Sequence, residues 1–193
     1  MLFAVSLISS HRASQEFGAT VNGASEKDGA FVFIGGAGND VFTGGAQVDI
    51  LIGGLGADIL TGGNGADIGA DVFVYAGATD SALQTSGGSI VVSGDDTIAA
   101  FQATLDKIDL TAFGFAGPGE AAITKPTTGF STDLASGAGF YGTAGVAVEY
   151  ASFGDTARVY VVANHDGNLG AGDMLIQLTG VTTNSITASS FTF

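Results

Sequence analysis

A nine-residue repeat between residues 35 and 75 is the feature that most restricts how this chain can fold. Its first three copies read GGAGNDVFT, GGAQVDILI and GGLGADILT, and a fourth begins in the same way, as GGNGADIGADVFVY. An apolar residue stands two places after the aspartate in each of the first three copies. Tandem copies in register indicate a solenoid, in which each copy stacks on its neighbours. The repeated aspartates are Asp40, Asp49, Asp58 and Asp67.

The spacing of nine residues predicts a particular coil. Each copy divides into a six-residue turn and a three-residue strand, and the turn glycines permit positive φ angles and leave backbone carbonyls accessible. Two copies complete one coil, so residues 18 apart in the sequence should stack. Asp40 is then expected over Asp58, and Asp49 over Asp67, on opposite edges. We therefore expect a short parallel β-roll of about two coils.

Stacking brings like charges together, which predicts a bound cation. Parallel strands lie about 4.8 Å apart, and two carboxylates about 5 Å apart repel by roughly 3 kcal/mol at an effective dielectric constant of about 20. A divalent ion between the coils would turn this repulsion into attraction. Carboxylates and carbonyls are the hard oxygen ligands of Ca²⁺. Zinc is disfavoured, because the chain has no cysteine and the repeats contain no histidine.

The predicted calcium ligands are the repeat aspartates and the carbonyls of the turn glycines. The fourth copy is ambiguous, because Gly69 stands where an apolar residue is expected and a second phrase, Gly69-Ala70-Asp71, follows four residues late. Either Asp67 or Asp71 is the last repeat aspartate, and a local bulge would let both serve. Gln47 replaces the fourth-position glycine of the second copy, and we expect it to strain that turn. The predicted carbonyl ligands belong to Gly36, Gly38, Gly45, Gly54, Gly56, Gly63 and Gly65.

The charge of the chain excludes several classes of partner. Nineteen acidic residues face five basic ones, which gives a net charge of −14. Nucleic acids and anionic membrane surfaces need clustered Lys and Arg, and this chain has no such cluster. No apolar run reaches the roughly 18 residues of a membrane span. Calcium ions are the partner that the charge favours.

The rest of the chain predicts an all-β protein with three parts. Residues 1–25 are expected to be a leader or cap that need not be well ordered, and residues 26–75 are expected to form the β-roll. Residues 76–193 are expected to form an antiparallel β-sandwich, because short alternating runs such as VAVEYASF, ARVYVVAN and DMLIQLTGV are separated by turn residues.

Three further polar groups have a structural and a functional interpretation. Asp95 and Asp96 precede an expected strand, where a turn or cap is favoured and a calcium site is the alternative. Residues 106–109 (DKID) are expected to form a solvated turn with an ion pair, rather than an acid–base pair for catalysis. The loop 166–173 (DGNLGAGD) is rich in oxygen donors, but a turn is favoured over calcium because the order of a calcium loop is missing.

The chain resembles known families in two places. Residues 35–75 resemble the RTX (hemolysin-type) calcium-binding repeats. The phrases ADVFVY at 70–75, DDTIAAF at 95–101, DKIDLTAFGF at 106–115 and DMLIQLTGV at 173–181 are similar to the C-terminal domain of serralysin-type secreted metalloproteases. The resemblance implies a parallel β-roll with Ca²⁺ held by aspartates and carbonyls. It also implies a following antiparallel sandwich that ends in an uncleaved C-terminal signal for type I secretion.

The functional hypothesis is a secreted, extracellular calcium-binding module without its own catalytic site, which folds or rigidifies on Ca²⁺ after export by type I secretion machinery. The motifs H-E-x-x-H and G-x-S-x-G are both missing, so we do not expect an enzyme. One alternative is a structural surface-layer, matrix or adhesin component, associated with the cell surface and self-associating through Ca²⁺. Another is the non-catalytic tail of a secreted enzyme such as a metalloprotease.

Overall fold

The structure is a computed structural model of the 193-residue chain. It describes residues 5–9, 17–63, 68–86, 89–91, 94–113, 123–124, 145–153, 156–164, 172–182 and 185–193. Within these ranges the chain consists of β-strands joined by turns and by short 3₁₀ helices. None of the described helices is long and apolar enough to cross a membrane.

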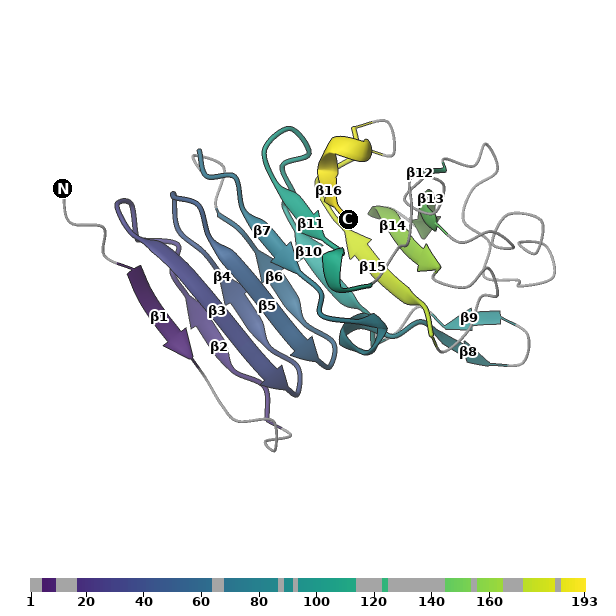
Figure 1. The fold of residues 1–193 in the computed structure, drawn as a ribbon, viewed down its shortest axis with the longest axis horizontal. Helices are drawn as coiled ribbons and strands as arrows, with labels where there is room; N and C mark the ends of the chain where they lie inside the picture. The colour runs from purple at the N-terminus through teal and green to yellow at the C-terminus, as the bar shows by residue number, and fades with distance from the viewer. Residues whose placement is uncertain are drawn as a thin grey trace.

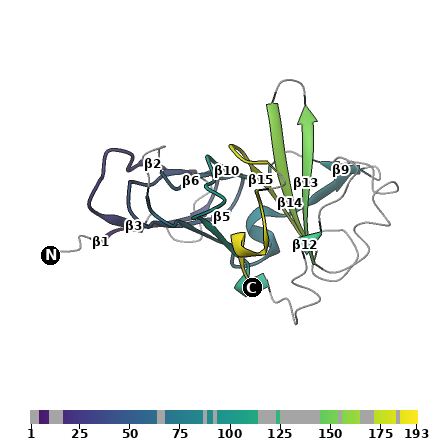
Figure 2. The same cartoon turned by 90° about the horizontal axis from the view of Figure 1, so that it is seen from above.

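The strands form two long sheets that lie face to face along the molecule (Figure 1 and Figure 2). The first sheet is parallel throughout. In spatial order its strands are β1 (Val5–Ser9), β3 (Ala30–Ala37), β5 (Ile50–Leu55), β7 (Val72–Val74), β11 (Lys107–Asp109) and β16 (Phe191–Thr192). Successive repeats alternate between this sheet and the second one, which is how the chain winds into a roll.

The second sheet is parallel over the roll, antiparallel in the next two strand pairs and parallel again in its last pair. Its spatial order is β2 (Thr20–Asn22), β4 (Val41–Thr43), β6 (Ile59–Thr61), β10 (Asp96–Ala99), β15 (Met174–Leu178), β14 (Thr156–Asn164), β13 (Gly145–Phe153) and β12 (Ile123–Thr124). The β13–β14 hairpin projects away from the roll (Figure 2). The two-stranded sheet of β8 (Gln84–Ser86) and β9 (Ser89–Val91) completes the described strands.

The core lies between the two sheets and is built from the apolar residue of each repeat. In the first sheet, register aligns Phe33 with Leu51, then Phe73, Ile108 and Phe191. In the second sheet it aligns Phe42 with Leu60, Ile98 and Leu178. The side chains in these two rows are all buried. Each coil therefore buries a matched pair of apolar layers, and the repeat spacing keeps the layers in register.

The all-β fold with a parallel roll is confirmed, and the roll is longer than the repeat. It begins with β1 and β2, which lie in the segment that we expected to be a leader or cap. It continues past Tyr75, because β10 and β11 pair in parallel with β6 and β7. The expected antiparallel pairing is present in β13, β14 and β15. The two sheets thus run without a break from the roll into the C-terminal half.

Candidate metal centre

One edge of the roll carries a ladder of aspartates, which we call the Asp40 ladder. It consists of Asp40, Asp58 and Asp96, each of which directly precedes a strand or begins one. The backbone N–H of Asp40 donates to Oδ1 of Asp58 at 2.7 Å, and the N–H of Asp58 donates to Oδ1 of Asp96 at 2.8 Å. The N–H of Ala19 donates in the same way to Asp40. Asp40 therefore stacks with Asp58, as the spacing predicted.

The opposite edge carries a second ladder, the Asp49 ladder, made of Asp49, Asp71 and Asp106. The N–H of Asp49 donates to Oδ1 of Asp71 at 2.7 Å, and that of Asp71 to Oδ1 of Asp106 at 3.1 Å. Phe31 begins this ladder by donating to Oδ1 of Asp49 at 2.6 Å. In both ladders one carboxylate oxygen accepts a charge-assisted hydrogen bond from the backbone N–H of the preceding coil.

The second ladder includes the later of the two aspartates of the fourth copy. Asp71 accepts the backbone N–H of Asp49, and Phe73 pairs with Leu51 two residues further on. Asp49 therefore stacks on Asp71, 22 residues along the chain, whereas the strict spacing of 18 residues predicted Asp67. The pairing of two buried apolar residues sets the register, and it places the aspartate two residues before Phe73 in the ladder. Asp67 and Gly65 lie outside the described residues.

For two aspartates of the Asp40 ladder, the second carboxylate oxygen accepts no hydrogen bond from the protein. Asp58 is 1 % exposed and Asp96 is 0 % exposed. The Oδ2 atoms of both are buried and accept no hydrogen bond. Buried polar atoms are almost always paired, because an unpaired one loses its hydration without compensation. These two oxygens are thus placed for a partner that is not part of the chain.

Burial also makes the ionised form of these carboxyls costly. It raises the pKa of Asp58 to about 7, with the charge of Asp40 as a further cause. Burial, followed by the negative charge of Asp58, raises the pKa of Asp96 to about 8. Each ladder carboxylate therefore disfavours ionisation of its neighbour. A divalent cation between them would remove this penalty.

The first glycine of each repeat makes room for the ladder carboxylate. A methyl group on Gly35 would lie 2.0 Å from Oδ2 of Asp40 and 2.2 Å from the carbonyl oxygen of Gly53, in the next coil. On Gly53 it would lie 2.1 Å from Oδ2 of Asp58. A carboxylate oxygen and a carbonyl oxygen from adjacent coils therefore gather at one point. Only glycine leaves that space open.

The turns on the edge of the Asp40 ladder adopt the left-handed conformation expected of the motif. The φ angles are 124° at Gly36, 98° at Gly38, 99° at Gly54 and 136° at Gly56. The carbonyl oxygens of Gly36 and Gly38 face Gly54 and Gly56 so closely that a methyl group there would lie 2.3 and 2.1 Å away. These carbonyls therefore lie between adjacent coils, at the end of the strand pair β3–β5 in which Gly36 pairs with Gly54.

The turns on the edge of the Asp49 ladder are built differently. Gly45 and Gly63 are buried, but neither has a positive φ angle. Gln47 adopts no left-handed conformation either, and its Nε2 donates to the carbonyl of Lys27 at 2.8 Å. The expected strain at Gln47 is therefore absent. Because this edge uses a side-chain amide where the other uses glycine, the two edges present different sets of carbonyls.

Two ladder residues lie outside the recognised repeat. Asp106 is 2 % exposed and accepts the N–H groups of Asp71 and Gln102, so the expected solvated turn is wrong. Nor does Lys107 form the expected ion pair, since its ammonium donates to the carbonyl of Ser189. The signal for Asp96 and Asp106 is the phrase aspartate-x-apolar, present here as DTI and DKI.

The donors suit a hard cation. No group of three or more His, Cys, Asp and Glu side chains in the described ranges converges on one point. An ion would therefore be held by carboxylates together with backbone carbonyls. Such an all-oxygen set is typical of Ca²⁺, which accepts six to eight oxygen ligands in flexible geometry. The residues present thus fit the predicted ion.

Comparisons with known proteins agree with this geometry. Residues 33–68 match the RTX calcium-binding nonapeptide repeat family, in four copies. The chain is similar to the R3 subunit of the AlgE6 mannuronan C5-epimerase of Azotobacter vinelandii, with a TM-score of 0.58 and 24% identity over 91% of this chain and 78% of that chain. It is also similar to the R2 subunit of that enzyme, with a TM-score of 0.53 and 24% identity over 100% of this chain and 92% of that chain.

A search of curated protein sequences finds no significant match. The two epimerase subunits share the fold of this chain, and the match to the repeat family covers the segment in which Asp40, Asp49 and Asp58 lie. Asp71, Asp96 and Asp106 lie beyond the matched residues, although they occupy the same ladders. Residues 33–68 of this chain match the RTX calcium-binding nonapeptide repeats, and Ca²⁺ is accordingly the ion that these repeats take.

Proposed function

We propose that this chain is a secreted calcium-binding module without a catalytic site of its own, and that Ca²⁺ drives its folding or rigidification. The observation that carries the proposal is the pair of buried Oδ2 atoms on Asp58 and Asp96 that accept no hydrogen bond. The proposed ligands are the carboxylates of the two ladders and the carbonyls of the turn glycines. Asp71 takes the place of Asp67 as the last repeat ligand.

Asp58 and Asp96 would each then have two roles. The Oδ1 atom of each accepts a backbone N–H from the preceding coil. The Oδ2 atom of each would contribute to the ion between coils. Without the ion, these two Oδ2 atoms are buried without compensation and the stacked charges repel. The coils would therefore close only when calcium is present.

This dependence would suit export. A chain with a net charge of −14 and no bound calcium would repel itself and stay loose where Ca²⁺ is scarce. Extracellular calcium sites often have dissociation constants of about 10⁻⁴ to 10⁻³ M, so the roll would close after release. Type I secretion is supported by the resemblance of the C-terminal half to exported proteases. The packing of Phe191 against Ile108 in the roll would couple the chain's C-terminal strand to the same event.

A second candidate is that the chain serves as a non-catalytic part of a larger secreted enzyme. It is supported by the two similar structures, which are subunits of an epimerase. In that case the roll would stabilise or position a catalytic part found elsewhere. The purified 193-residue chain should then leave mannuronan unchanged with Ca²⁺ present. Turnover of mannuronan by this chain would contradict both candidates.

Circular dichroism in a calcium titration tests the proposed function. The β-sheet signal should rise with Ca²⁺, fall on addition of EDTA, and return when calcium is restored. Mg²⁺ at the same concentration is the control, because its smaller ion demands tight octahedral geometry that mixed carbonyl turns do not offer. A circular dichroism spectrum and a melting temperature that do not change on addition of Ca²⁺ would overturn the proposal.

A further inference from the structure

The Asp40 ladder has a third rung that the repeat does not include. Asp96 begins β10, which pairs with β6 in the same parallel register in which β6 pairs with β4. Its phrase DTI matches the aspartate-x-apolar pattern, and Ile98 takes the place of Leu60 in the core row. The Gly-Gly turn is missing before it. Asp96 therefore occupies the ladder position of a repeat aspartate, although the loop before it differs from the turn of a repeat.

This rung concentrates buried polar atoms. Oδ2 of Asp58 and Oδ2 of Asp96 are buried and accept no hydrogen bond of normal geometry, and the hydroxyl of Tyr75, which is 1 % exposed, is buried as well. Burial, and then the negative charge of the Asp96 carboxylate and a side-chain interaction with it, raises the pKa of Tyr75 well above its usual value. The charge of Asp80 also acts on Asp58 and Asp96. Two facing carboxylates, a third nearby and no cationic side chain among them leave the charge uncompensated.

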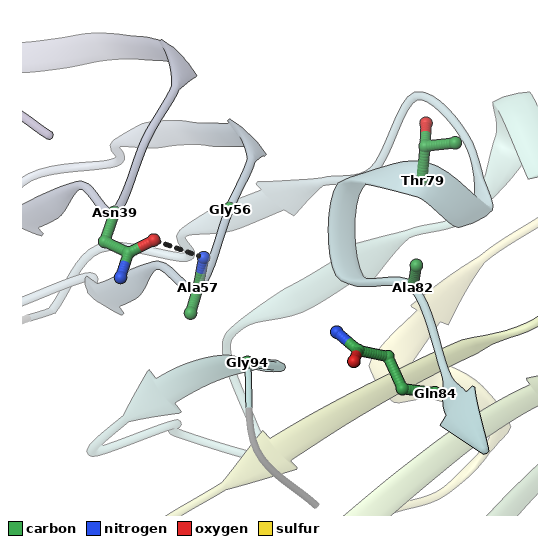
Figure 3. Close-up of a pocket in the computed structure, with 7 residues that line it drawn as sticks. All are labelled: Asn39, Gly56, Ala57, Thr79, Ala82, Gln84 and Gly94. Atoms are coloured by element: carbon green, nitrogen blue, oxygen red, sulfur yellow. Dashed lines mark hydrogen bonds between the residues drawn. The ribbon is translucent and has the colours of Figure 1, made fainter. Parts of the chain in front are cut away.

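An open cleft of about 300 Å³ lies between the turns of the roll and the segment that follows Tyr75 (Figure 3). It is lined by turns of the roll, by the 3₁₀ helix η1 (Ala78–Ser81) and by the start of β8. Its lining side chains are uncharged. Four lining residues, Asn39, Ala57, Thr79 and Gly94, each directly precede a buried aspartate. The cleft therefore lies next in sequence to four buried aspartates, while its own lining is uncharged.

The same rung connects the roll to the C-terminal half. The N–H of Asp96 donates to Oγ of Ser81 at 2.8 Å, and the Ser81 hydroxyl donates to the carbonyl of Leu175 at 2.5 Å. Ser81 thus replaces the next aspartate as the acceptor at the end of the ladder. Asp96 also pairs with Ile176 in β15. Whatever fixes the Asp96 carboxylate therefore fixes β15 against the roll.

We propose that Asp58 and Asp96 hold a divalent cation of the calcium type at this last rung, outside the nonapeptide repeats, and that the ion locks β15 onto the roll through Ser81. The inference rests on the proposed calcium-dependent function. Asp80 adds negative charge near the ion, while its Oδ2 accepts the N–H of Ala76 at 2.6 Å and so holds its own loop. Tyr75 lies beside the ion without being required to bind it.

Terbium provides the probe, because Tb³⁺ replaces Ca²⁺ in oxygen sites and emits when a nearby tyrosine is excited. The chain has four tyrosines and no tryptophan. Tyr75→Phe should reduce tyrosine-sensitised emission several-fold while the number of bound Ca²⁺ ions stays unchanged. Asp96→Asn should remove that emission and lower the calcium count by one ion. Asp109→Asn is the matched control, since it removes one charge from the partly exposed Asp109, outside both ladders, and should change neither reading.

The outcomes separate this inference from the proposed function. If the wild-type chain binds several Ca²⁺ ions but Tyr75→Phe keeps its full emission, the site is not at this rung and only the inference fails. If the wild-type chain binds no Ca²⁺, both fail. Should Asp96→Asn not fold, the Tyr75→Phe comparison still decides, because that variant keeps both proposed ligands.

The link to β15 is tested by hydrogen exchange. In the wild-type chain, Ca²⁺ should slow exchange of the amides of β15 as well as those of the roll. Ser81→Ala should keep the calcium count and the terbium emission, but the protection of β15 should respond to Ca²⁺ much less. An unchanged response in Ser81→Ala would overturn the proposed coupling and leave the site itself standing.

Discussion

The backbone N–H of Asp58 donates to Oδ1 of Asp96, 38 residues further along the chain, at 2.8 Å. This bond repeats the contact between Asp40 and Asp58, which are 18 residues apart. The extra 20 residues include η1 and the β8–β9 hairpin. The roll therefore tolerates a long excursion between two coils, provided that the chain returns with an aspartate in the ladder position.

Calcium should stabilise the wild-type chain by several kcal/mol. At a tenfold excess over its dissociation constant, one site that forms only in the folded state adds about 1.4 kcal/mol to the free energy of unfolding. Several sites in the two ladders should add more, and the melting temperature should continue to rise with Ca²⁺ concentration. Differential scanning calorimetry at a series of calcium concentrations measures this. A melting temperature that stops rising after the equivalent of one site would contradict two loaded ladders.

Asp58→Asn should reverse the effect of calcium on stability. The asparagine keeps Oδ1 as acceptor for the N–H of Asp40 but removes the buried charge. In EDTA the variant should therefore unfold at higher urea concentration than the wild-type chain, and in saturating Ca²⁺ at lower. Asp28→Asn, in an exposed loop, is the control with the same change of charge and should follow the wild-type chain. A uniform loss in both buffers would mean that Asp58 is only structural.

Without calcium, stability should fall as the pH rises from about 4 to about 8. Burial raises the pKa of Asp58 and of Asp95 from 3.8 to about 7, and that of Asp96 to about 8. Between these values the folded state holds more protons than the unfolded state, so the free energy of unfolding decreases with pH. Urea midpoints measured in EDTA across this range test the sign. Saturating Ca²⁺, which binds the ionised carboxylates, should abolish the decrease.

Gly53→Ala should destabilise the roll by about 1–3 kcal/mol, the usual cost of inserting a methyl group into a packed site. The new methyl would lie 2.1 Å from Oδ2 of Asp58 and would displace that carboxylate. The apparent calcium affinity should fall together with the stability. Gly77→Ala is the control, because nothing lies within 4 Å of its added methyl and its φ angle of 174° is extended. Equal effects of the two substitutions would exclude a specific role for the space at Gly53.

The roll is predictable from the sequence because segments that keep a nine-residue period stack on one another. The place of Asp71 in the ladder is not predictable in this way. The period favours Asp67, whereas the buried pair of Leu51 and Phe73 sets the register in the folded chain. Packing of the core overrides the spacing of the turns at this point. The repeat therefore predicts the ion but leaves the last aspartate open between Asp67 and Asp71, and the strand pairing of the folded chain places Asp71 in the ladder.

Asp96 and Asp106 escape prediction for a different reason. Their phrases, DTI and DKI, are too short to distinguish a ladder residue from an aspartate in an ordinary turn. Only the pairing of β10 with β6 and of β11 with β7 shows that both stand at the end of a coil. Contacts between residues this far apart depend on the closed roll, so they carry no local pattern. β1 and β2 likewise join the roll through pairing rather than through a repeat of their own.

Because successive repeats alternate between the two sheets, an odd and an even change in the number of repeats have different consequences for the roll. Phe42 and Leu60 lie in one sheet and Leu51 in the other, so each nonapeptide inserted or deleted would transfer every later strand to the opposite sheet. β10 would then meet the wrong neighbours, and Asp96 would align with the Asp49 ladder. Two nonapeptides, 18 residues, restore the original sides. Relatives of this module should therefore differ in length by even numbers of repeats, and an odd number should require a compensating change in the loops that follow.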